Sequence, residues 1–95
     1  MIYHLVFFKL QEDQKHRKEE VIAALRDLKE KIPQLQDLTA GEDFNRSPAA
    51  FDIGLQTLFA TTEDLATYQK HPDHLKVVEL INETTSERAV VDYKI

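Results

Sequence analysis

The chain has 95 residues, of which 42% are hydrophobic and none is cysteine, and its formal net charge is −5 at pH 7. This composition excludes disulfides and thiolate zinc sites, and the scatter of Lys and Arg among acidic residues predicts no nucleic-acid partner. The longest apolar run near the N-terminus, Leu5 to Phe8, is far shorter than the roughly 20 residues that span a membrane, and no signal-peptide pattern precedes it. We expect one small cytoplasmic domain over residues 1–95, with no membrane partner, which dimerisation would stabilise.

The first ten residues alternate as a β-strand does, with two largely apolar faces. One face has Ile2, His4, Val6, Phe8 and Leu10, and the other has Tyr3, Leu5, Phe7 and Lys9. Since one layer of helices covers only one face, something else must cover the second. We expect this cover to be a second copy of the sheet, in a homodimer. His4 is the only polar member of its face, and a buried imidazole needs hydrogen-bond partners.

A helix is predicted over residues 11–31, with Asp13 as its N-cap and Pro33 directly after its end. Its apolar stripe consists of Val21, Ile22, Leu25, Leu28 and Ile32. The opposite surface mixes both signs of charge and is typical of a solvated helix face.

Two strands joined by a loop are predicted next. Residues 34–43 fit a short strand in which Gly41 marks a bulge or the end, and residues 51–59 alternate well, with Leu55 on the apolar face. The loop over residues 44–50 is indicated by the turn formers Asn45, Ser47 and Pro48.

A proline interrupts the second helical region. Thr61 or Thr62 begins the first part, and Pro72 begins the second, since proline is tolerated in the first turn of a helix. His74 is spaced i, i+4, i+7 with Val78 and Ile81, so it points with this apolar stripe toward the sheet. A polar turn over residues 83–87 and a strand over residues 88–95 are predicted to end the chain.

The order strand, helix, strand, strand, helix, strand predicts a ferredoxin-like α+β fold with a four-stranded antiparallel sheet. The first and third strands are central in that topology, and the second helical region crosses the face that holds His4. We therefore expect His4, Tyr68 and His74 to meet between the sheet and the helices.

Motifs throughout the chain resemble one known family. They are Ile2 to Leu10, Lys31-Ile32-Pro33, Glu63-Asp64-Leu65, His71-Pro72-Asp73-His74 and Val90-Val91-Asp92-Tyr93. The chain is similar to the stress-responsive α/β-barrel (Dabb) family of dimeric ferredoxin-like proteins, and the histidine-proline motif is the most specific part of the match. The resemblance implies a homodimer in which two four-stranded sheets close into one barrel.

One branch of that family, a plant polyketide cyclase that makes olivetolic acid, uses a tyrosine and a histidine of this motif for an aldol closure. By position, the resemblance implies these roles for Tyr68 and His74, with His71 as the second motif histidine and His4 as the strand histidine. The first helix departs from the cyclase, because it has aliphatic residues where the cyclase has aromatic ones.

Two functional hypotheses and one structural alternative follow. The first is an enzyme without a cofactor, a cyclase, lyase or isomerase, in which His74 is the acid or base and Tyr68 donates to a carbonyl oxygen. The second is a dimeric module that binds a small apolar or carbonyl ligand in a pocket lined by His4, Val6, Phe8, Leu25, Leu55 and His71. In the structural alternative, the two motif histidines only cap the helix junction. A metal site at the histidines and Asp73 is not favoured, because histidines three apart across a proline are unusual ligands.

Overall fold

The computed structural model describes all 95 residues as a four-stranded sheet with a layer of helices. Its elements in chain order are β1 (Ile2–Leu10), a 3₁₀-helix η1 (Glu12–Arg17), α1 (Lys18–Lys31), β2 (Asp37–Glu42), β3 (Ile53–Phe59), α2 (Thr62–Lys70), α3 (Pro72–Thr84) and β4 (Thr85–Lys94). The strands are antiparallel in the order β2-β3-β1-β4. The predicted ferredoxin-like α+β fold is confirmed, and β1 and β3 are its central strands.

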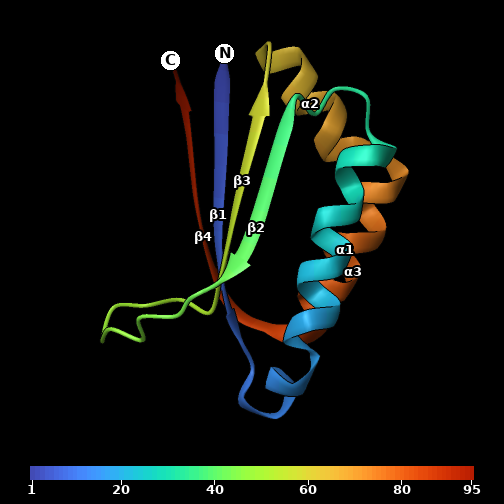
Figure 1. Cartoon of the computed structure of the whole chain (residues 1–95). Coiled ribbons are helices and arrows are strands. Elements are labelled where there is room, and N and C mark those ends of the chain that lie inside the picture. The colour runs from blue at the N-terminus through green and yellow to red at the C-terminus, as the bar shows by residue number, and fades with distance from the viewer.

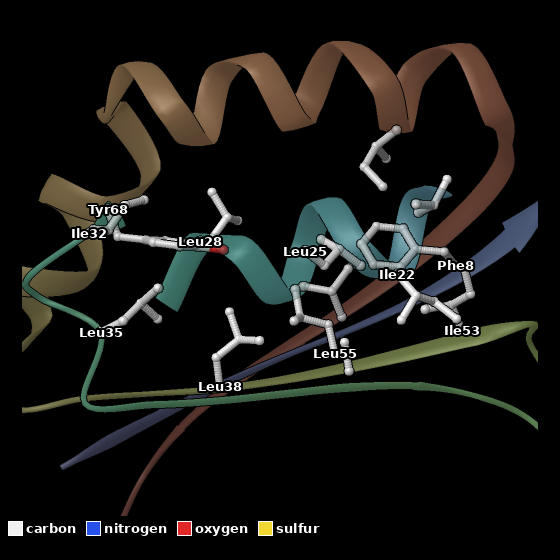
Figure 2. Packing of buried hydrophobic residues seen from close by; sticks show 14 of the residues in the cluster. Phe8, Ile22, Leu25, Leu28, Ile32, Leu35, Leu38, Ile53, Leu55 and Tyr68 are labelled. Atoms are coloured by element: carbon white, nitrogen blue, oxygen red, sulfur yellow. The ribbon is translucent and has the colours of Figure 1, made fainter. Parts of the chain in front are cut away.

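The helices cover one face of the sheet, and Figure 1 shows the other face without helices. The even-numbered residues of β1 point into the helical layer and are all buried, as the alternation predicts. The core between the layers includes Phe8, Leu25, Leu28, Leu55 and Tyr68 (Figure 2). No helix is both long and apolar enough to span a membrane.

The uncovered face of the sheet is apolar and accessible. Phe7 is 39% exposed, and Val91 and Tyr93 on the neighbouring β4 are exposed as well. A hollow of about 830 Å³ lies on this face beside the loop between β2 and β3, with Leu5, Phe7, Phe44 and Phe51 among its lining. Phe44 is 93% exposed. The odd-numbered face of β1 therefore lacks a cover within one chain, as the sequence predicts.

The start of the first helix differs from the prediction. Residues 12–17 form a 3₁₀-helix, α1 begins only at Lys18, and Asp13 caps neither helix. The reason is a tether at Gln11, whose backbone N–H donates to the carbonyl of Thr84 at 2.8 Å while its side chain donates to the carbonyl of Thr85 at 3.2 Å. This tether holds the end of β1 against the end of α3, and the chain turns tightly before α1.

The predicted polar turn over residues 83–87 is wrong, since α3 continues to Thr84 and β4 begins at Thr85. Both threonine hydroxyls donate to carbonyls of the last helical turn, Thr84 to Leu80 at 2.8 Å and Thr85 to Ile81 at 2.7 Å. The backbone N–H of Thr85 also donates to the carbonyl of Ile81, so the helix is capped by the first residue of β4 and the strand starts without a separate turn.

The remaining elements agree with the prediction apart from small shifts of their ends. Thr61 is the N-cap of α2, and its hydroxyl accepts from the backbone N–H of Asp64 at 3.1 Å. Gly41 pairs with Gly54 in regular register, one residue before β2 ends, so there is no bulge at this position.

Candidate functional site

The junction between α2 and α3 sets the direction of the motif side chains. His71 has an extended backbone and is at once the C-cap of α2 and the N-cap of α3, while Pro72 occupies the first turn of α3. The ring Nδ1 of His71 accepts from the backbone N–H of Asp73 at 3.1 Å. Tyr68 thus lies in the last turn of α2 and His74 in the first turn of α3, and both are close to one corner of the sheet.

A cavity of about 200 Å³ lies between the sheet and the helices at this corner. Its polar lining comes from β1, α2, α3 and β4, and consists of His4, Tyr68, Gln69, His74 and Arg88. The rest of its lining is apolar, with Val6, Phe8, Leu25, Leu55, Val77, Val78, Ile81 and Val90.

Tyr68 occupies the centre of the polar group. Its ring centroid is 4.4 Å from that of His74 and 6.2 Å from that of His4, and it packs at 5.0 Å against the ring of Phe59. The residue is only 1% exposed, and Figure 2 shows it in the layer between the helices and the sheet. Burial raises the pKa of Tyr68 to about 12. Its hydroxyl therefore remains protonated near neutral pH and can donate a hydrogen bond.

His74 is held by the backbone at the end of α2. Its Nδ1 lies 3.0 Å from the carbonyl oxygen of Gln69, so this nitrogen carries the proton and donates. The Nε2 atom of the neutral ring is then a free acceptor. Burial lowers the pKa of His74 from 6.5, although the Gln69 carbonyl raises it, and repulsion by Arg88, and by His4 and His71 whenever they are protonated, lowers it further. The ring is consequently neutral at pH 7, as a general base must be.

His4 has a carboxylate partner across the sheet. Its Nδ1 is hydrogen-bonded to the Oδ1 atom of Asp92, which lies directly opposite in the register of β1 and β4. This bond places the proton on Nδ1 and leaves Nε2 as an acceptor. The hydroxyl of Thr57 donates to the backbone carbonyl of His4 at 2.9 Å and fixes the strand beneath the ring.

Three polar atoms at the cavity have no hydrogen-bond partner within the chain: Nε2 of His4, Nε2 of His74 and the hydroxyl of Tyr68. Every fully buried polar side-chain atom of the chain does have a partner, so these three atoms retain accessible surface. The residues that carry these two acceptors and one donor all line the cavity.

The structure brings most of the predicted site residues to this cavity. His4, Val6, Phe8, Leu25, Leu55, Tyr68 and His74 all line it. His71 does not, and its assignment to the pocket is corrected: its ring turns back to cap α3, which withdraws it from the cavity.

Three residues at the site were missed from the sequence, namely Gln69, Arg88 and Asp92. The signal for Asp92 is the strand pairing, because in an antiparallel sheet the partner of His4 follows once the register of the last strand is known. No group of three or more His, Asp and Glu side chains has the arrangement of a metal site.

Comparison with known proteins gives a family and a set of structures. The family model of the Stress responsive A/B Barrel Domain (Dabb) matches residues 2–95. No functionally curated protein matches the chain.

Among solved structures, a dimeric ferredoxin-like protein of unknown function from Bacteroides fragilis is 29% identical, with a TM-score of 0.86 over 99% of this chain and 95% of that one. A dimeric ferredoxin-like protein of unknown function from Thermobifida fusca is 25% identical, with a TM-score of 0.89 over 99% of this chain and 90% of that one. The hydroxynitrile lyase from Passiflora edulis shares the fold at 18% identity, with a TM-score of 0.87 over 99% of this chain and 92% of that one.

Proposed function

The chain belongs to the stress-responsive A/B barrel (Dabb) family, and on this premise we propose that it is a homodimer that binds a small carbonyl compound in the cavity between β1, α2 and α3. The observation that supports this most strongly is the set of three unpartnered polar atoms on His4, Tyr68 and His74. Every fully buried polar side-chain atom is paired within the chain, whereas these three atoms are unpaired on residues that line the cavity.

The size and polarity of the cavity favour a ligand of about one ring. An apolar cavity of about 150 Å³ is known to accommodate benzene, and this cavity has about 200 Å³. An extended polyketide chain would exceed it. The carbonyl oxygen of the ligand accepts from the Tyr68 hydroxyl, while the apolar walls of Val6, Leu25 and Val78 surround its hydrocarbon part.

Ligand binding is tested by thermal unfolding with acetophenone, an uncharged ketone with one ring. A ligand that binds only the folded state raises the melting temperature. We expect a rise for the parent protein and a smaller rise or none for Tyr68→Phe and His74→Ala. The matched control is His16→Ala, which removes an exposed histidine remote from the cavity and keeps the response. Equal rises in all four proteins would contradict binding at this site.

A second candidate function, proton transfer on the bound carbonyl compound, is favoured by the state of His74. Its Nε2 accepts a proton from the carbon next to the carbonyl, the electrons of the broken C–H bond form a carbon–carbon double bond, and the carbonyl π electrons move to the oxygen, which the Tyr68 hydroxyl stabilises. The resulting enolate is the common first intermediate of isomerisation and aldol closure. The fold is compatible with catalysis on small carbonyl-derived compounds, since a hydroxynitrile lyase has it.

Catalysis is tested separately from binding, by the exchange of the methyl protons of acetophenone in D₂O, followed by NMR. We expect the protein to accelerate exchange and His74→Ala to reduce the acceleration by about 10²–10⁴-fold, the usual contribution of a general base. If acetophenone binds but the exchange of its methyl protons is not accelerated, the binding function stands and the catalytic function is wrong.

A further inference from the structure

Arg88 is the one permanently charged residue that lines the cavity, and no carboxylate lines it. Arg88 forms no ion pair and no hydrogen bond within the chain. By contrast, Arg17 and Arg46 each have carboxylate partners, and Arg26 donates twice to the carbonyl of Ala40. Arg88 is an exposed residue of the edge strand β4, and its guanidinium, with five donors, borders the apolar cavity without a partner in the chain.

The sheet register separates the backbone of Arg88 from that of His4 along the strands. His4 lies opposite Asp92, Val6 opposite Val90, and Phe8 opposite Arg88. Along β4 the backbone of Arg88 is thus four residues from that of Asp92, or about 14 Å at 3.4 Å per residue. Along β1 and β4 the lining thus runs from His4 through Val6 and Val90 to Phe8 and Arg88.

A carboxylate is the group that this arrangement fits. Arginine binds a carboxylate through two parallel hydrogen bonds, and such charge-assisted bonds are stronger than those between neutral groups. Asp92 is engaged with His4, so the cavity lining supplies no competing acid.

We propose that the ligand of this cavity is a carboxylic acid with a carbonyl group at its far end, held by Arg88 at the carboxylate and by Tyr68 at the carbonyl oxygen. This inference rests on the proposed binding function and narrows its ligand class to small oxo acids of about one ring. Arg88 would orient the ligand. It would also weaken the binding of neutral analogues, because a site built to hydrogen-bond one group rejects analogues that lack that group.

The test compares two probes of the same shape, 4-acetylbenzoate and its neutral analogue 4-acetylbenzamide. Their dissociation constants are measured by NMR titration of the parent protein, Arg88→Gln and Lys76→Gln. Lys76 is exposed on α3 and does not line the cavity, so its substitution controls for the change in net charge. We expect the parent to bind the carboxylate at least about tenfold more tightly, a factor that corresponds to one charge-assisted hydrogen bond. Arg88→Gln loses this preference, and Lys76→Gln keeps it.

Two other outcomes would contradict either the role of Arg88 or the binding function itself. If the parent binds both probes equally, or Arg88→Gln keeps the preference, the selection of an anion by Arg88 is wrong while the carbonyl site stands. If neither probe perturbs the ring resonances of His74, the proposed binding function itself is wrong, and this inference falls with it.

Discussion

Burial and, for His74, a hydrogen-bond partner determine the protonation states of His74 and Tyr68. The Gln69 carbonyl fixes which nitrogen of His74 is protonated, and the apolar walls disfavour the charged ring. Burial likewise keeps the phenol of Tyr68 protonated. One residue is therefore an acceptor and its neighbour a donor under the same conditions, a pairing that suits a carbonyl guest with an acidic C–H.

The lowered pKa of His74 predicts how stability changes with pH. The unfolded chain binds a proton at His74 near pH 6.5, whereas the folded chain binds it only at lower pH. As the pH falls below about 6.5, the unfolded state gains the proton first, so the free energy of unfolding decreases until the pH has passed below the folded pKa. We expect urea unfolding to show a smaller loss between pH 7 and pH 5 for His74→Gln than for the parent. An identical pH dependence would contradict the lowered pKa.

At the scale of the elements, hydrophobic periodicity predicted the strands, the helices and their order, because one buried face dictates which residues alternate. Periodicity could not give the register of β4 against β1, and so Asp92 and Arg88 were missed. The helix ends depended on hydrogen bonds between residues far apart in sequence, such as Gln11 with Thr84, and these are invisible to local patterns. The meeting of His4 with Tyr68 was predictable because two apolar faces had only each other to pack against.

The junction of α2 and α3 gives a prediction about His71. Its ring accepts from the backbone N–H of Asp73, a capping role that asparagine can also fill. We expect His71→Asn to lower the free energy of unfolding by well under about 1.5 kcal/mol, the range of cap replacements. Urea unfolding measures this change, and the thermal response to acetophenone should be unaltered. A protein of full stability that no longer responds to acetophenone would show that His71 contributes to ligand binding.

At the scale of the whole molecule, one face of the sheet has no cover within the chain. One side of the sheet is covered by helices and the other is not (Figure 1). Phe7, Val91 and Tyr93 are exposed on the uncovered side. The two dimeric structures from Bacteroides fragilis and Thermobifida fusca have the same fold, and a homodimer that joins two such faces would bury these residues. A chain of this length gains much from such burial, because its own core is small.

If two chains pair through this face, we expect Leu5→Asp to dissociate or unfold the protein, because the substitution puts an unpaired charge in an apolar contact. Leu75→Asp is the matched control, because Leu75 is 51% exposed on α3 and lies in the helical layer. Light scattering should give a dimer for the parent and for the control at micromolar concentration. A stable monomer for the parent protein would refute the dimer without any variant.

The most direct test of the central claim is the imidazole ¹⁵N NMR spectrum of the folded protein, recorded across pH and with acetophenone. We expect His4 and His74 to carry a proton on Nδ1 at pH 7.5, His74 to titrate below pH 6.5, and acetophenone to move the Nε2 resonance of His74. The resonances of exposed His16 should not move with the ketone. The proposal that this cavity binds a carbonyl compound would be wrong if the rings are protonated on Nε2. It would also be wrong if a saturating concentration of acetophenone leaves the His74 resonance unchanged.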